Sequence, residues 1–255
     1  MMLALALQIV LLLTSPPPAT PGASLRARTL AVLNFDNNTG RADYDPMGRG
    51  LAAMMINDLA VSPELRLVER ERMQDVLKEQ QMQRSAMFDS TTAVKAGRLL
   101  GAEIIATGSL AAAGTELRID MRLIRVETGE IIKSARATGP EDKLFDLERQ
   151  LAERVLKDLD IALSPESVEL MRKRQEANRE MGVRAFRDFS SGLLAMDNGD
   201  YVRAADLFRP LMMQAPDSPV VALAYGEAKR RASLAAKEAA KKKAGDALRG
   251  LFKKP

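Results

Sequence analysis

The sequence predicts an α/β domain, built on a mixed five-stranded sheet flanked by helices, followed by an α-helical region. Between residues 29 and 139, short apolar runs alternate with segments of helical periodicity, a pattern typical of strands joined by helices. Residues 117–123 alternate apolar and charged side chains, which indicates an antiparallel strand with one solvent-facing side. Beyond residue 165, small and aromatic residues recur at the spacing of paired helices.

Apolar runs predict five strands, at residues 30–35, 65–68, 104–110, 117–123 and 131–137. Helical segments separate the first three strands, so we expect these strands to be parallel, with right-handed crossovers. Turns at Ala113–Gly114 and Thr128–Gly129 join the last three, which predicts an antiparallel meander.

Four helices are predicted around the sheet. The first has Asp45 as its N-cap and Pro46 at its first position, and it ends before Ser62–Pro63. The second covers residues 70–84, the third residues 91–100 after a cap at Asp89–Ser90, and the fourth residues 141–163. Gly101 is expected to end the third helix as its C′ residue. The inward stripes are Met47, Leu51, Met54, Met55 and Leu59 in the first, Met73, Val76, Leu77 and Gln80 in the second, and Leu144, Leu147, Leu151, Val155 and Leu159 in the fourth.

Composition excludes several kinds of catalytic site. The chain of 255 residues contains neither histidine nor cysteine, which excludes Ser-His-Asp and Cys-His nucleophilic sites. The same absence excludes Cys/His zinc sites, cysteine-ligated iron–sulfur clusters and disulfides. Carboxylate metal sites and acid–base chemistry by lysine or glutamate are not excluded by composition.

Residues 1–23 are predicted to be a secretory signal peptide. Residues 3–13 are almost wholly apolar, and a segment rich in proline and small residues follows, with cleavage expected near Ala23. Eleven helical residues span roughly 16 Å, which is too short for a hydrocarbon core of about 30 Å. The segment has no Lys or Arg before Arg26, so a disordered apolar leader or a misassigned start codon are the alternatives.

Five segments carry a resemblance to a known family. They are Val32–Gly40, Leu67–Arg70, Leu77–Gln80, Ala96–Ala102 and Thr107–Ser109, and their motif residues are Phe35, Asn38, Gly40, Glu69, Arg70, Gly101 and Gly108. In this order and spacing they resemble the curli production assembly/transport component (CsgG) family, and the related FlgO-type and TolB N-terminal-like domains. The resemblance spans residues 29–162.

The resemblance implies a bacterial cell-envelope protein with a non-enzymatic role in assembly or secretion. It also implies, for the curli channel itself, long membrane hairpins and an N-terminal lipid anchor. This chain departs from both features, because the meander at residues 103–138 has only short loops and the lipidated cysteine is absent. The resemblance therefore supports the α/β domain rather than the pore.

Residues 165–235 are predicted to form a tetratricopeptide-like helical region. The residues at the offsets of that repeat are Gly192, Gly199, Tyr201, Ala204, Phe208 and Pro216. The small residues would let two helices approach, the aromatic residues would fill the space between them, and Pro216 would end the second helix. A third helix is expected from Pro219. One and a half repeats need a further surface to cover them, so docking on the α/β domain, on the preceding helix or on another subunit is expected.

The last residues form a basic tail, at 236–255. From Glu227 to Pro255 there are ten Lys or Arg and three acidic residues, so this end has a net charge of +7. The whole chain has a net charge of +4, so the rest of it is slightly acidic. The first interpretation is a solvated helix, and the second is a weak contact with an anionic membrane surface. Nucleic acid is not an expected partner, because aromatic residues are nearly absent from the tail and no recognition motif accompanies it.

A glycine motif was weighed as a dinucleotide site. Residues Gly48–Ala53 match G-x-G-x-x-A, and Glu69 and Glu71 follow about 20 residues later, as such a site requires. A loop that includes Asp45–Pro46 separates these glycines from the first strand, however. We interpret them as small residues at a contact between helix and sheet, and expect no cofactor.

Other polar and methionine positions received structural interpretations. Asp36, Asp43 and Asp45 lack the order of a calcium-binding EF-hand, so turn and capping roles are predicted and no metal site is expected. Residues 69–72, Glu-Arg-Glu-Arg, are predicted to form local ion pairs. The methionines expected in the core are Met47, Met54, Met55, Met212 and Met213.

These observations predict a non-enzymatic, exported cell-envelope protein that acts as a scaffold or assembly component. A periplasmic location, with or without association to the outer membrane, is expected. The expected partners are other cell-envelope proteins, with further copies of the chain as a second class. The predicted contact surfaces are the tetratricopeptide-like groove and an exposed face of the first helix. One alternative is a ring-forming component of an outer-membrane secretion apparatus, and another is an enzyme or ligand-binding domain, for which no sequence feature speaks.

Overall fold

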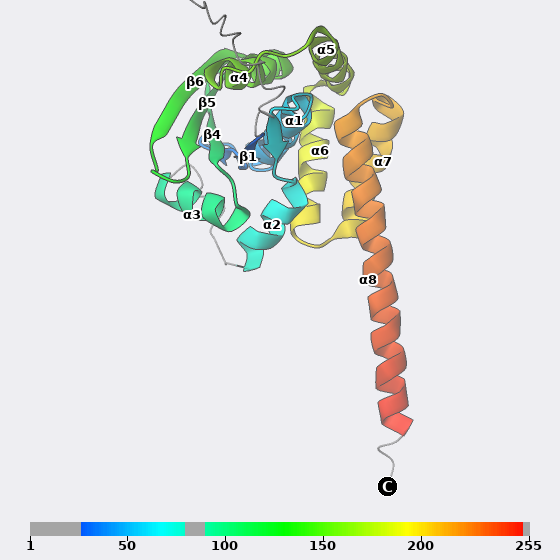
Figure 1. Ribbon diagram of the computed structural model, residues 1–255. Coiled ribbons are helices and arrows are strands. Elements are labelled where there is room, and N and C mark those ends of the chain that lie inside the picture. The colour runs from blue at the N-terminus through cyan, green and yellow to red at the C-terminus, as the bar shows by residue number, and fades with distance from the viewer. Residues whose placement is uncertain (1–26, 80–89, 252–255) are drawn as a thin grey trace, which may run out of the picture.

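The computed structural model describes residues 27–79 and 90–251 (Figure 1). The predicted signal peptide at residues 1–23, the end of the second predicted helix at residues 80–84 and the capping residue Asp89 lie outside the described residues. The described part has a mixed sheet covered by helices, followed by a helical region whose last helix extends away from the body (Figure 1).

The sheet has the predicted mixed topology with one strand more than expected. Its order is β3-β1-β4-β5-β6, and β2 pairs with β4 beside β1. The strands are β1 (Arg28–Val32), β2 (Asp36–Asn37), β3 (Leu65–Leu67), β4 (Ile104–Ala113), β5 (Glu116–Arg125) and β6 (Ile131–Pro140). β1 is parallel to β3 and β4, while β4, β5 and β6 form the antiparallel meander. The additional strand β2 arises because two polar residues of the predicted turn pair with Ser109 and Leu110.

Helices cover both faces of the sheet. Helices α1 (Met47–Leu59) and α4 (Leu144–Asp158) share one apolar core with alternate residues of β1, β4 and β5. Helices α2 (Arg70–Glu79) and α3 (Ser90–Leu100) share a smaller core with the opposite residues of the same strands. Two short 3-10 helices, η1 (Ala42–Tyr44) and η3 (Glu141–Lys143), precede α1 and α4. The helix predicted at residues 141–163 therefore begins as a 3-10 turn and ends at Asp158.

The alternation in β5 has the predicted consequence. Leu117, Ile119, Met121 and Leu123 are buried under α1 and α4, as their spacing indicates. On the other side, Asp120 accepts from Arg118 Nε of the same strand and from Arg136 Nε of β6, both at 2.7 Å, so the second contact is a cross-strand ion pair. Gly114 and Gly129 adopt φ of +65° and +75° at the two predicted hairpin turns.

The helical region consists of α5 (Pro165–Arg179), α6 (Gly182–Asp197), α7 (Tyr201–Gln214) and α8 (Pro219–Leu251). It docks on the α/β domain, since α6 packs along α1 and both contribute to one continuous core. Helix α8 is unbroken through the predicted boundary at residue 236, and its second half projects beyond the body (Figure 1).

The predicted repeat residues lie where α6 meets α7. A Cβ atom at Gly192 would lie 2.3 Å from the Phe208 ring, and both residues are buried together with Ala204. Gly199 has φ +79°, and Asp200 caps α7 by accepting from the backbone N–H of Arg203 at 3.1 Å. Pro216 follows the end of α7, and Tyr201 is partly buried. These contacts show a close antiparallel helix pair, while membership of the tetratricopeptide family stays a prediction.

Three local predictions are wrong. Helix α1 has Pro46 at its N-cap with no side-chain capping bond, because Asp45 Oδ1 accepts from Asn37 Nδ2 at 2.5 Å instead. Met213, predicted to lie in the core, is 85% exposed on α7. Helix α1 offers no broad exposed face for a partner, since α6 packs against the side that points away from the sheet and all its residues except Arg49 and Ile56 are buried.

Gly192→Ala tests the close approach of α6 and α7. We expect it to lower the free energy of unfolding by about 1–3 kcal/mol, because the new methyl group meets the buried Phe208 ring. Gly226→Ala, one repeat period later, is the matched control: a Cβ there meets nothing within 4 Å, so it should raise stability by about 0.5–1 kcal/mol. Urea unfolding of both variants measures the difference, and equal effects would contradict the packing assignment.

Candidate functional site

The family-motif residues near the N-terminus form the connection from β1 to α1. Phe35 packs on Gly108 of β4, where a Cβ atom would lie 2.2 Å from the ring. The backbone N–H of Asn38 donates to the carbonyl oxygen of Leu110 at 2.7 Å, and Gly40 turns the chain with φ +74°. These three motif residues therefore set the path of the loop.

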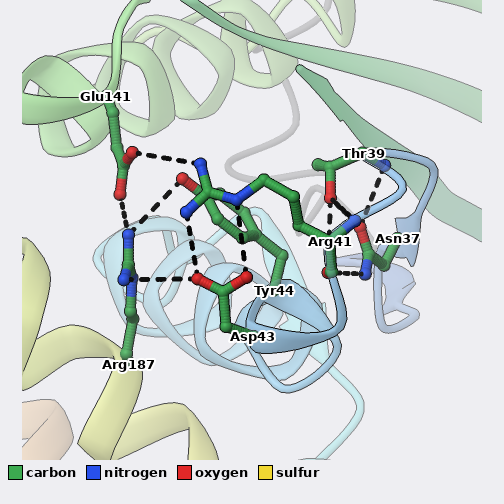
Figure 2. Close-up of polar contacts among 7 residues, drawn as sticks. All are labelled: Asn37, Thr39, Arg41, Asp43, Tyr44, Glu141 and Arg187. Atoms are coloured by element: carbon green, nitrogen blue, oxygen red, sulfur yellow. Dashed lines mark hydrogen bonds and ion pairs between the residues drawn. The ribbon is translucent and has the colours of Figure 1, made fainter. Parts of the chain in front are cut away.

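The side chains that hold this loop together are ones that the sequence did not single out. Asn37 Nδ2 donates to the carbonyl oxygen of Arg41 at 2.8 Å, and Thr39 Oγ1 donates to Asn37 Oδ1 at 2.6 Å (Figure 2). Asn37 thus uses both ends of its amide within the loop, while its neighbour Asn38 contributes backbone. The Asn-x-Thr spacing at residues 37–39 is the sequence feature that could have predicted these bonds, because it favours turns closed by side-chain to backbone hydrogen bonds.

A polar network connects this loop to the helical region (Figure 2). Two guanidinium groups lie near the buried Tyr44 ring, with Arg41 at 4.1 Å and Arg187 of α6 at 5.1 Å from its centroid. Arg187 also pairs with Glu141 of η3 and, at 3.4 Å, with Asp43. Burial and the Glu141 carboxylate raise the pKa of Tyr44 to about 12, so the phenol stays protonated. With two arginines and two carboxylates, the network is a neutral clamp.

A second clamp centres on Asp197 at the end of α6. Its carboxylate accepts from Arg49 Nε of α1 at 2.9 Å and from Arg70 Nη2 of α2 at 2.6 Å. Only 1% of the Asp197 side chain and 7% of the Arg70 side chain are exposed. The motif residue Arg70 therefore pairs with a partner in the helical region, which corrects the prediction of a local ion pair for this residue.

Between the two clamps, small residues of α1 admit α6. A Cβ atom at Gly50 would lie 2.2 Å from Ser190 Oγ and 2.6 Å from the Phe186 ring. A Cβ atom at Gly48 would lie 1.8 Å from the carbonyl oxygen of Phe35. The glycines of the G-x-G-x-x-A run are thus packing positions, and Gly50 faces α6 rather than the sheet. We call this contact of α1 with α6, with its two clamps, the junction.

Two carboxyl groups are buried beside the junction. Asp58 of α1 is 0% exposed and accepts from Gln175 Nε2 of α5 at 2.8 Å and from Asn57 Nδ2 at 3.3 Å. Glu148 of α4 is 1% exposed, and its Oε1 has no hydrogen-bond partner among the described residues. Burial raises the pKa of Asp58 to about 6, and burial together with the Asp58 carboxylate raises the pKa of Glu148. The burial of Glu148 could have been predicted from the sequence, because this residue lies between Leu147 and Leu151 on the inward side of α4.

The junction leaves an open groove of about 980 Å³, which we call the α8 groove. Its floor and walls come from α1, α2, α5, α6 and α8. Apolar lining residues include Ile56, Val76, Phe189, Val220 and Leu223, and Leu223 is 70% exposed. Charged residues form much of the rest of its lining: Glu69, Arg70, Arg72, Asp75, Arg174, Glu227, Arg230 and Arg231. A groove of this size lined by both apolar and charged side chains suits a protein segment more than a polar metabolite.

The described residues hold no group of three or more acidic side chains placed to bind a metal ion. Asp43 pairs with Arg41 at 3.0 Å and Asp45 accepts from Asn37, so these carboxylates serve the loop. In residues 27–79 and 90–251, none of the helices has the length and apolar character of a membrane span. The motif residue Gly101 has φ +67° and ends α3, as predicted, and Glu69 lines the α8 groove.

Comparisons with known proteins concern the α/β part of the chain. Residues 19–118 match the family model of the curli production assembly/transport component CsgG, which confirms the resemblance at residues 29–118. A search of curated protein sequences finds no significant match.

Several solved structures are similar to part of the chain. The LpoB C-terminal domain from Salmonella enterica is 20% identical, with 45% of this chain and 84% of the domain covered at a TM-score of 0.39. Lipoprotein GNA1162 from Neisseria meningitidis is 15% identical, and the match covers 53% of this chain and 99% of the lipoprotein at a TM-score of 0.40. A PelC dodecamer from Paraburkholderia phytofirmans is 17% identical, and the match covers 54% of this chain and 90% of the PelC chain at a TM-score of 0.34.

Asp197→Asn tests the second clamp. The substitution leaves two arginines at the junction without their counter-charge, so we expect the free energy of unfolding to fall by about 3 kcal/mol. Asp206→Asn, which breaks an exposed pair with Arg209 on α7, should cost less than about 1 kcal/mol. Urea unfolding checks both values, and a similar small cost for the two variants would show that the clamp does not hold the junction.

Glu148→Gln tests the buried carboxyl pair through its pH dependence. A carboxyl with a raised pKa binds more protons when folded, so the free energy of unfolding falls as pH rises from about 4 through that raised pKa. The charges around the pair are Arg149 and Glu153 of α4 and Arg174 of α5. We expect Glu148→Gln to stabilise the chain by about 1–3 kcal/mol near pH 8 and to weaken the pH dependence between about pH 5 and pH 8.

The matched control for that experiment is Glu238→Gln, an exposed glutamate on the projecting half of α8. It should leave the pH dependence of the wild-type chain unchanged. Wild-type stability that rises from pH 5 to pH 8, or an unchanged slope in Glu148→Gln, would contradict the assignment.

Proposed function

We propose that this chain is an exported cell-envelope protein that works without catalysis, as a scaffold or assembly component for other envelope proteins. The α8 groove carries this proposal. Its walls come from both the α/β domain and the helical region, and the junction holds them in one arrangement. A preformed groove of this size, with an exposed leucine on its wall, is the kind of surface that binds a partner segment.

The family match supports the place of action. The matched family is described as a curli production assembly/transport component, a role served at the bacterial cell envelope. The apolar leader predicted at residues 3–13 supports export to that compartment. The absence of histidine and cysteine removes the commonest nucleophilic and zinc-dependent mechanisms, and this favours a binding role over an enzymatic one.

Photocrosslinking in the native host tests the proposal. A photoreactive phenylalanine replaces Leu223 on the groove wall in one tagged variant and Met213 on the outer side of α7 in another; both side chains are strongly exposed. After irradiation and fractionation, we expect tagged adducts with an envelope protein from position 223 and few from position 213. Mass spectrometry identifies the protein in the adduct.

Two results would count against this function. One is recovery of the tagged chain in the cytoplasmic fraction, and the other is equal crosslinking from the two positions. Native mass spectrometry of the same preparation addresses the ring-forming alternative, because a secretion ring would give one defined high-order oligomer.

A further inference from the structure

One line of residues on α8 joins the groove to the projecting half of the helix. The residues are spaced alternately by four and three, as in the seam of a helix that packs against another helix, and we call them the α8 seam: Leu223, Glu227, Arg230, Leu234, Lys237 and Lys241. The first three line the α8 groove. The next three continue the line along the exposed helix, where Leu234 is 46% exposed.

The wall that carries the seam is preformed. Arg231 Nε donates to Glu227 at 2.7 Å within α8, and Arg231 Nη1 lies 3.5 Å from Asp75 of α2. Val220 and Val221 at the start of α8 are buried in the main core. A partner would therefore meet a wall already fixed relative to α1 and α2, which keeps the entropic cost of binding low.

The charge along this helix is strongly one-sided. Residues 229–243 contain seven basic residues and one acidic residue, Glu238. The basic residues are Lys229, Arg230, Arg231, Lys237, Lys241, Lys242 and Lys243. In the groove itself, five arginines and three carboxylates line the surface. A partner that follows the seam therefore passes from an apolar pocket into a region of positive potential.

We propose that the α8 groove and seam bind an amphipathic helix with acidic flanks, supplied by a partner protein. Its apolar side would contact Leu223, Leu234 and the groove floor, and its carboxylates would lie near Arg230, Lys237 and Lys241. This inference deepens the proposed function, on which it rests, by naming the chemistry of the partner. A helix in a groove is a recurring mode of recognition, and opposite charges at the flanks select the partner.

Two other occupants fit less well. In a second copy of the chain, the same seam would bring lysines and arginines toward lysines and arginines, which is unfavourable. A flat anionic membrane could meet the projecting half of α8, but it cannot reach the partly buried apolar residues inside the groove, such as Ile56 and Val76. An acidic helix is the occupant that uses both the apolar groove and the basic seam.

Two synthetic helical peptides of about 21 residues test the proposal with the full chain. Both carry the same leucine and alanine side, and one has glutamates at the flanking positions where the other has lysines. Fluorescence anisotropy should show the glutamate peptide binding at least about tenfold more tightly, with an affinity that falls as salt is added. Leu223→Gln should weaken it about tenfold, and Lys237→Gln with Lys241→Gln should weaken it and flatten the salt dependence. Met213→Gln is the control and should bind as wild type does.

Equal binding of the two peptides overturns the proposal. Binding of the glutamate peptide that is unchanged in both the Leu223→Gln variant and the double lysine variant also overturns it. So does tighter binding to vesicles of phosphatidylglycerol that depends on Lys237 and Lys241 but not on Leu223, because a membrane surface is then the partner. If the peptide result fails while photocrosslinks from position 223 persist, the proposed function stands and only the acidic helix is wrong.

Discussion

The arrangement of this chain depends on one contact, the packing of α6 on α1. Gly50 has no side chain where Ser190 and Phe186 approach, so the two helices meet closely. On one side Asp197 holds Arg49 and Arg70, and on the other Arg187 reaches Glu141, Asp43 and Tyr44. The ion pairs fix the orientation of α6 relative to α1, and the buried apolar surface supplies most of the stability of the junction.

The junction explains why the helical region and the α/β domain share one core. Helix α6 has an apolar side that needs a partner surface, and α1 supplies part of it. The same docking places the start of α8 beside α1 and α2 and so creates the α8 groove. A surface made from two parts of the chain can act in binding only while those parts keep their relative position, which links stability of the junction to function.

The sequence predicted most of the fold, because the relevant signals are local. Alternation located β5, and glycines at positive φ located the turns at Gly101, Gly114 and Gly129. The signals failed where a partner lies far away in the chain. Arg70 pairs with Asp197, 127 residues later, and nothing near Arg70 distinguishes that pair from a local one. The burial of α1 on both sides depended likewise on docking by α6, and β2 on backbone pairing of residues with turn chemistry.

The most direct test of this account is the distance distribution between two spin labels, one on each part of the chain. The chain has no cysteine, so Arg66→Cys on β3 and Met213→Cys on α7 give two unique and exposed labelling positions. A fixed junction predicts one narrow distribution in solution. A broad distribution, or several separated peaks, would show that the helical region moves relative to the sheet and that the α8 groove is not preformed.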